Sequence, residues 1–234
     1  MMNEDLTNWK GCDQVEVPVV SGTHVKVRPL TECHEALELW SALGGSDAND
    51  YMRFFPNPDF ADGGAFWDWL EAARGSFQTA LFVHPGSGQI MGMANYMRND
   101  PANGSVEVGA IAHGKMMAAT PASTEGQYLL ARHVFEQQGY RRYEWKCHNE
   151  NEASKRAALR LGFTFEGVFR QHIVSRGKNR DTAWFSMIDK EWPSIAAAFE
   201  AWLDPANFDL EGRQIRRLEE LRLADQGADT PPSF

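Results

Sequence analysis

The stretch that decides the fold of this chain opens with Ser105-Val106-Glu107-Val108-Gly109-Ala110-Ile111 and runs to Phe169. Its first residues alternate apolar with polar or small side chains, which predicts a strand with both valines and Ala110 on one side. A loop of residues 112–123 follows. Thr124-Glu125-Gly126-Gln127 then places Thr and Gln three residues apart, a capping-box pattern that predicts the start of a helix ending near Gly139.

A second strand, helix and strand complete the stretch. Residues 142–147 alternate, with Tyr143, Trp145 and Cys147 on one face and charged side chains on the other. A helix is predicted from Asn151 to Gly162, because glycine suits the left-handed position that follows a helix. Residues 163–165 then resume strand alternation, so the predicted order is strand, loop, helix, strand, helix, strand.

These motifs carry a resemblance to a known family. Asn151-x-x-Ser154 followed by Leu161-Gly162-Phe163-x-Phe165-Glu166-Gly167 resembles the C-terminal half of GNAT N-acyltransferases, and most of all the branch that includes ribosomal-protein N-terminal acetyltransferases. The resemblance spans residues 23–189. It implies an α/β fold with a central, mostly antiparallel mixed sheet, one splayed parallel strand pair and flanking helices. It also implies transfer of an acetyl group from acetyl-coenzyme A, without a metal, to a primary amine of a small molecule or a protein N-terminus.

The chain divides into an N-terminal arm (1–22), an acyltransferase domain (23–190) and a C-terminal helical extension with its tail (191–234). Strands expected at 24–30, 79–84 and 90–97 form an antiparallel meander, and Thr182–Ile188 is the expected last strand. Residues 170–180 are basic and expected to be exposed. Helices are expected at 192–203 and 210–223; the second packs on the domain or against another subunit, which leaves a homodimer as one alternative.

Composition limits the classes of partner and location. The net charge of −9, from 32 acidic and 23 basic residues, argues against broad nucleic-acid affinity, which needs basic residues to neutralise phosphates. Three cysteines without metal or disulfide spacing indicate reduced thiols. No apolar run approaches the roughly 18 residues of a membrane span. We therefore expect a cytoplasmic protein that binds neither nucleic acid nor membrane.

The resemblance also implies where acetyl-coenzyme A binds. The pantetheine arm is expected between strands 105–111 and 143–147, with backbone amides near Ala110 and Ile111 facing the thioester carbonyl. The pyrophosphate is expected at the N-terminus of the following helix, where free amides and the helix dipole favour anions. The remaining expected cofactor ligands are Thr120, Ala122, Ser123, Thr124, Asn151, Ser154 and Arg156.

The predicted phosphate loop departs from the family pattern Gln/Arg-x-x-Gly-x-Gly/Ala. In residues 118–123, Ala118 takes the place of the first residue and Pro121 that of the central glycine. Proline has no backbone donor. Two alternatives follow: the loop binds coenzyme A in a modified way, or coenzyme A binds weakly or not at all. In the second case the fold serves as a ligand-binding protein or as an enzyme of another reaction class.

Glu107 is the candidate general base, because it points to the face opposite its valine neighbours and therefore toward the expected cleft. The alternative is a strand carboxylate that is solvated or paired in a salt bridge. Residues 50–60 combine four aromatic residues with two prolines. In the family this region borders the acceptor site, whereas the alternative is a loop held by buried aromatic side chains. The expected acceptor-binding residues are Tyr51, Phe54, Phe55 and Tyr96.

Overall fold

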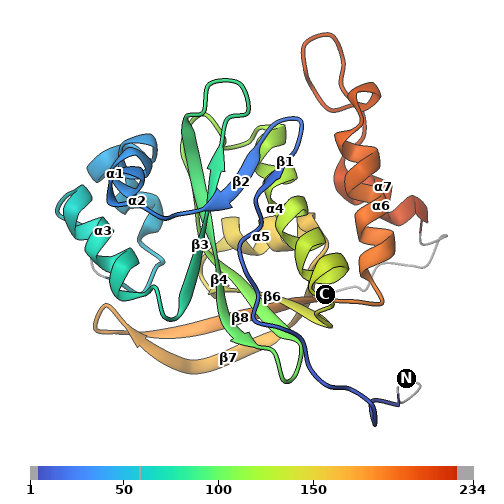
Figure 1. Ribbon diagram of the computed structural model, residues 1–234, viewed down its shortest axis with the longest axis horizontal. Helices are drawn as coiled ribbons and strands as arrows, with labels where there is room; N and C mark the ends of the chain where they lie inside the picture. The colour runs from blue at the N-terminus through green and yellow to red at the C-terminus, as the bar shows by residue number, and fades with distance from the viewer. Residues whose placement is uncertain (1–4, 58, 226–234) are drawn as a thin grey trace.

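A single twisted sheet forms the centre of the computed structural model, which describes residues 5–57 and 59–225 (Figure 1). The sheet has eight strands in the order β1-β2-β3-β4-β5-β6-β8-β7, and only the β5–β6 pair is parallel. The predicted mixed sheet with one parallel pair is therefore confirmed. Its strands are β1 (Val20–Ser21), β2 (Lys26–Pro29), β3 (Phe77–Val83), β4 (Ile90–Asp100), β5 (Ser105–His113), β6 (Arg142–His148), β7 (Thr164–Ser175) and β8 (Lys178–Ile188).

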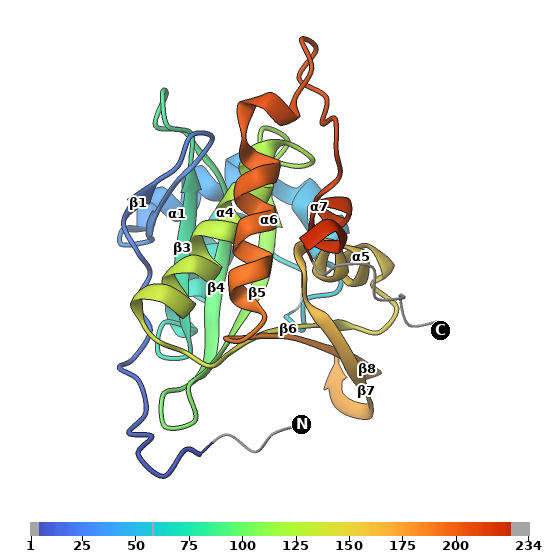
Figure 2. The same ribbon diagram turned by 90° about the vertical axis from the view of Figure 1, so that its right-hand side faces the viewer.

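Helices cover both faces of this sheet (Figures 1 and 2). The first layer holds α1 (Cys33–Ala42), α2 (Ala48–Met52) and α3 (Gly63–Ala72). The opposite layer holds α4 (Pro121–Arg132), α5 (Glu152–Leu161), α6 (Trp192–Leu203) and α7 (Leu218–Asp225), with a π-helical turn, His133–Gln137, after α4. None of the helices within residues 5–57 and 59–225 is long and apolar enough to cross a bilayer.

Each face of the sheet has its own hydrophobic core, because successive strand residues point to opposite sides. Leu81 and Met93 pack with α1 and α3 on one face, whereas Phe82 and Ala94 pack with α4 and α6 on the other. The predicted alternation in β6 holds, since Tyr143, Trp145 and Cys147 are buried in the core beneath α4 and α6. The charged residues of β6 are thereby left on the face that carries the candidate site.

The start of α4 was predicted wrongly. The helix begins at Pro121 with Thr120 as its N-cap, three residues before the predicted capping box. Proline fits the first helical position because its fixed backbone angle matches the helix and its missing N–H needs no helical partner. Glu125 has a different role, since its buried carboxylate accepts hydrogen bonds of 2.6–2.9 Å from the amides of residues 23–25.

Two predictions for the C-terminal part also need correction. A helix from residue 210 is wrong: α7 begins at Leu218, and residues 208–217 form an irregular loop organised by Asn207, whose side chain bonds to backbone atoms of Arg216. The segment 170–180 is a β-hairpin and not uniformly exposed, since Arg180 is buried. The helix α7 contacts α5 and α6 of its own chain, and the tail from residue 226 lies outside the described residues.

Candidate active site

Strands β5 and β6 separate halfway along their length. They pair from Ser105 to Val108 and from Arg142 to Trp145, but β5 continues to His113 and β6 to His148. Figure 2 shows the two strands diverging, with β6 remaining alongside β8. Beyond Val108, the edge of β5 that faces β6 has no strand partner anywhere in the described part of the chain. The predicted splayed pair is thus present, and it opens the sheet.

A bulge lies on β5 where the two strands part. Register with β4 passes from Asn95 opposite Gly109 to Met93 opposite Ala112, so Ala110 and Ile111 face a single residue. Ala110 has a φ of 44°, in the left-handed region. The buried Asn95 donates from Nδ2 to the carbonyl of Ala110 (3.2 Å) and accepts from the hydroxyl of Thr79 (2.6 Å). A side-chain clamp therefore fixes a bulge that re-aims the β5 backbone toward the opening.

A cleft with a cavity volume of about 360 Å³ lies at this opening. One part, here called the strand end, is formed mainly by backbone and small side chains: Val108, Gly109, Ala110, Ile111, Cys147, Asn151, Ser154 and Ala157. The other part, the aromatic end, combines rings with charged or titratable groups: Tyr51, Phe54, Phe55, Trp69, Phe77, Arg98, Glu107, Lys146, His172 and Arg180. Eight of the predicted site residues therefore line one cleft: Tyr51, Phe54, Phe55, Glu107, Ala110, Ile111, Asn151 and Ser154.

Glu107 lies on the floor of the aromatic end and is only 3% exposed. Its Oε2 contacts Nη1 of Arg98 at 2.8 Å and Nζ of Lys146 at 2.9 Å. Lys146 also contacts Glu144 (2.7 Å) and sits 3.8 Å from the ring centroid of Trp184. The sequence left two alternatives for Glu107, a general base or a carboxylate that is solvated or paired in a salt bridge. The geometry shows a carboxylate paired in salt bridges. Pairing and a catalytic role are compatible, and the role of Glu107 as a base stays a prediction.

The ion pairs continue along the same face, away from the cleft. Arg142 joins Glu144 to Glu166, with nitrogen–oxygen distances of 2.7 Å and 2.6 Å respectively. Burial opposes ionisation of Glu144, but hydrogen bonds from Lys146 and Arg142 outweigh burial and lower the pKa of its carboxyl group. Charges of alternating sign therefore run across neighbouring strands, and Arg98, Glu107 and Lys146 are the members of this series that line the cleft.

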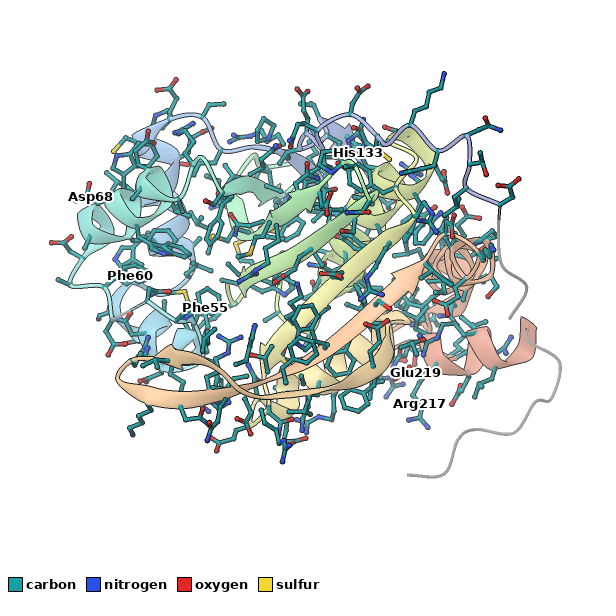
Figure 3. The ribbon with its side chains drawn as sticks, turned by 90° about the horizontal axis from the view of Figure 1, so that it is seen from below. Phe55, Phe60, Asp68, His133, Arg217 and Glu219 are labelled. Atoms are coloured by element: carbon teal, nitrogen blue, oxygen red, sulfur yellow. The ribbon has the colours of Figure 1, made fainter. Side chains whose placement is uncertain are left out.

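The wall of the aromatic end comes from the segment after α2. Figure 3 shows Phe55 and Phe60 on this segment, beside the β7–β8 hairpin. The ring of Phe54 lies 5.4 Å from that of His148. Arg176, at the turn of the hairpin, donates to the carbonyl of Phe55 (3.2 Å) and to Asp59 (2.7 Å). Segments more than 100 residues apart in sequence thus close the cleft together.

The N-terminus of α5 borders the strand end. Asn151 is the N-cap of α5, and its Oδ1 accepts from the amide of Ser154 (3.1 Å). The indole Nε1 of Trp145 donates to the Ser154 hydroxyl (3.0 Å). Asn151 therefore caps the helix and lines the cleft at once. The position of Asn151 and Ser154 in the cleft does not test whether they bind a cofactor, so that role stays a prediction.

The residues predicted to bind phosphates lie at the start of α4, outside the cleft. The hydroxyls of Thr120 and Ser123 donate to the carbonyls of Met117 and Thr120. Thr124 is buried, and its hydroxyl accepts from Arg160 (3.0 Å), so its side chain is engaged within the protein, while its expected role in cofactor binding stays a prediction. The left-handed residue of the loop is Ala119, with φ 59°, two positions before the proline that was aligned with the family's glycine.

Of the other phosphate candidates, the Ala122 side chain is buried at the first turn of α4, and Arg156 is exposed on α5. Neither lines the cleft.

Tyr96, predicted to bind the acceptor, does not line the cleft. It is buried on the opposite face of the sheet, and its hydroxyl donates to the carbonyl of Leu130 in α4 (2.9 Å). The register explains why: Tyr96 pairs with Val108, and directly paired residues share a face of the sheet.

Sequence reasoning missed the cationic side chains of the aromatic end, above all Arg180, and the nearby His172. The Nδ1 atom of His172 lies 3.0 Å from the hydroxyl of Thr182. Partial burial, followed by the nearby charges of Arg180 and Arg98, lowers the pKa of His172. One signal was available: Arg180, Thr182 and Trp184 alternate along β8 and therefore share a face.

His113 closes the strand end at the end of β5. Burial lowers the pKa of its imidazole to about 4, so the ring is neutral at neutral pH. Its ring packs at 5.7 Å from that of Phe82, and within the described residues its Nε2 has no hydrogen-bond partner. The cleft thus holds one half-buried neutral imidazole, apart from the charged groups of the aromatic end.

Comparisons with known proteins agree with this architecture. Residues 24–164 match the model of the acetyltransferase (GNAT) domain. The structure of a GCN5-related N-acetyltransferase from Brucella melitensis shares 42% identity over 93% of this chain and 99% of that one, with a TM-score of 0.87. A probable acetyltransferase of the GNAT family from Chromobacterium violaceum shares 32% identity over 82% of this chain and 97% of that one, with a TM-score of 0.74.

A more distant likeness concerns the fold alone. The ribosomal-protein-S5-alanine acetyltransferase of Vibrio fischeri is 16% identical over 74% of this chain and 97% of that one, with a TM-score of 0.59. No protein among those with curated functions matches the chain.

Proposed function

Because the chain belongs to the GNAT acetyltransferase family, we propose that it transfers an acetyl group from acetyl-coenzyme A directly to a primary amine. The observation that carries this proposal is the separation of β5 from β6 at a clamped bulge. There the β5 backbone borders a cleft and not a neighbouring strand. A thioester is already activated, so an enzyme needs chiefly to position it, stabilise the oxyanion and accept the amine proton.

In this proposal acetyl-coenzyme A occupies the strand end. The pantetheine arm lies between β5 and β6, its thioester carbonyl faces the amides of Ala110 and Ile111, and Asn151 and Ser154 flank the arm. The pyrophosphate lies at the N-terminus of α4, where free amides and the helix dipole favour anions. Thr120, Ala122 and Ser123 remain candidates for contacts there, while Arg156 is an exposed cation on α5 within the same layer.

The amine enters from the aromatic end, past Tyr51, Phe54 and Phe55. Its nitrogen attacks the thioester carbon, a C–N bond forms, the C–S bond breaks, and coenzyme A leaves as the thiol. Glu107 accepts the proton that the amine loses, either directly or through water. Ala158 occupies the position of the tyrosine acid found in other branches of the family and is buried, so the proton for the leaving sulfur comes from another source.

The rival proposal, a fold that no longer binds coenzyme A, depended on Pro121 as a residue inside the phosphate loop. Pro121 lies at the first position of α4, which proline commonly occupies, and so gives the rival no specific support. A location in the cytoplasm stays a prediction.

Calorimetry and thermal unfolding with coenzyme A test the proposal, together with thiol release from acetyl-coenzyme A in the presence of a panel of amines. At about 100 times its Kd, the ligand is expected to stabilise the fold by about 2.7 kcal/mol. If saturating coenzyme A produced no heat of binding and no thermal stabilisation, the proposal would be overturned.

A further inference from the structure

Arg180 is a buried cation that forms no ion pair with a carboxylate in the described part of the chain. It is 9% exposed and lines the aromatic end of the cleft. Its Nη1 donates a long hydrogen bond to the carbonyl of Phe54 (3.4 Å). Its buried Nε has no hydrogen-bond partner within residues 5–57 and 59–225. A guanidinium taken out of water is costly unless its donors are satisfied. Its fork of N–H groups is therefore suited to bind an anion that enters the cleft.

The surroundings of Arg180 strengthen this indication. Among the described residues, those with charged side chains that line the cleft are the three cations Arg98, Lys146 and Arg180 and the carboxylate of Glu107, while Glu144 pairs with Lys146 from just outside the cleft. The Glu107 carboxylate is already shared by Arg98 and Lys146. The whole chain carries a net charge of −9, so a positive cleft is opposite in sign to the protein around it. A protonated amine alone would be repelled here, whereas an amine that also carries an anion would be attracted.

We propose that Arg180 binds a carboxylate of the acceptor, which makes the acceptor class of this acetyltransferase a small aminocarboxylate with an apolar body. The inference rests on the proposed function and names its substrate class. Arginine matches a carboxylate with two parallel N–H···O bonds, which a carbonyl cannot reproduce with equal strength.

The size and lining of the cleft favour a small acceptor. Because Arg180 is buried, the anion that reaches it lies inside the cleft and not on the protein surface. Phe54, Phe55 and Trp69 offer rings to an apolar body. Glu107, on the floor of the same cleft, lies within electrostatic range of Arg180. A molecule that carries its amine and its carboxylate on one carbon can present the carboxylate to Arg180 and the amine toward the Glu107 side of the cleft.

The experiment compares two acceptors of nearly the same shape, phenylalanine and phenylalaninamide, which differ in the carboxylate. The measured quantity is the ratio of their kcat/KM values in wild type and variants, because this comparison cancels the intrinsic reactivity of each amine. The ratio of kcat/KM for phenylalanine to kcat/KM for phenylalaninamide is expected to be higher in wild type than in Arg180→Gln. The preference should fall about ten- to hundredfold, the range of a hydrogen bond between charged groups. Arg180→Lys, which keeps the charge but loses the fork, should give an intermediate ratio.

Arg176→Gln is the matched control. Arg176 belongs to the same hairpin and contacts the same aromatic segment, but it does not line the cleft. Its loss is expected to leave the ratio unchanged. An equal loss of preference in both variants, or an unchanged ratio in Arg180→Gln, overturns the inference.

If wild type acetylates neither acceptor, binding of N-acetylphenylalanine and N-acetylphenylalaninamide by calorimetry measures the same ratio without turnover. Equal affinities overturn the inference. Absence of coenzyme A binding overturns the proposed function instead, so the two failures are distinguishable.

Discussion

The two ends of the cleft are built in different ways. The strand end consists of the bulge on β5, the separated edge of β6 and the start of α5, all within residues 105–157. The aromatic end gathers side chains from α2 and the segment after it, from α3, from β3, β4, β5 and β6, and from the β7–β8 hairpin. One end is made of backbone that is local in sequence, whereas the other is made of side chains brought together by the fold.

This difference predicts different responses to mutation. Backbone groups survive most substitutions, so the strand end should fail only when the geometry of its bulge fails. The aromatic end should respond residue by residue, through charge and shape. The predictions below test that distinction, beginning with the largest expected effect.

Glu107→Gln should lower turnover roughly 10²–10⁴-fold, the usual contribution of general-base catalysis. The Kd of coenzyme A should stay nearly unchanged, because Glu107 belongs to the aromatic end. Steady-state kinetics and calorimetry measure the two effects.

Glu144→Gln is the control for Glu107→Gln, since it removes the other carboxylate of Lys146 at a position outside the cleft. It should affect turnover far less. Equal turnover in Glu107→Gln and wild type would remove Glu107 from the mechanism.

Acidification should destabilise the strand end through His113. The pKa of this imidazole is about 4 in the fold, against 6.5 ordinarily, so the unfolded chain binds a proton first as pH falls. The stability due to the neutral ring is present above pH 6.5 and is lost as pH falls toward 4, by on the order of 2–3 kcal/mol. Urea unfolding of wild type and His113→Gln between pH 4 and 7 isolates this component. Parallel stability curves for the two proteins would contradict the prediction.

Asn95→Ala should cost about 1–3 kcal/mol of folding stability, because it leaves the Ala110 carbonyl without this donor and the Thr79 hydroxyl without this acceptor. It should also weaken coenzyme A binding while leaving the choice between acceptor amines unchanged. Asn99→Ala is a control on the same strand, where Asn99 donates to Tyr140 away from the cleft. A changed acceptor preference in Asn95→Ala would break the separation between the two ends.

Pro121→Gly should have the smallest effect. It removes a favourable first helical residue and loosens the unfolded chain, which lowers stability by about 0.4–1 kcal/mol. The regained N–H acts in the opposite direction on phosphate binding, so the Kd of coenzyme A should change by less than about tenfold. Urea midpoints and calorimetry provide both values. A larger loss of affinity would mean that the proline itself shapes the phosphate site.

The strand end could be predicted from sequence because its signals are local. Alternation around Glu107, the Asn151 cap and Gly162 past the end of α5 all correspond to the structure. The start of α4 was missed because the pattern Thr-x-x-Gln matches a capping box even when it lies inside a helix. The role of Glu125 could not be predicted because its partners, residues 23–25, lie about 100 positions away in the sequence.

The aromatic end could be predicted only in part. The cluster of rings in residues 50–60 was a local signal, whereas Arg180 became visible only when the hairpin folded over that segment. Tyr96 was expected to bind the acceptor, but its side of the sheet follows from its pairing with Val108 between β4 and β5, which a local pattern does not show. Side chains that meet through tertiary contacts leave little trace in a local pattern.

A crystal structure of the protein with acetyl-coenzyme A tests the central claim most directly. The account predicts the pantetheine arm between β5 and β6, with the thioester carbonyl beside the amides of Ala110 and Ile111 and the acetyl group directed toward Glu107. Coenzyme A bound elsewhere, with the gap between β5 and β6 closed or filled by another segment, would contradict it.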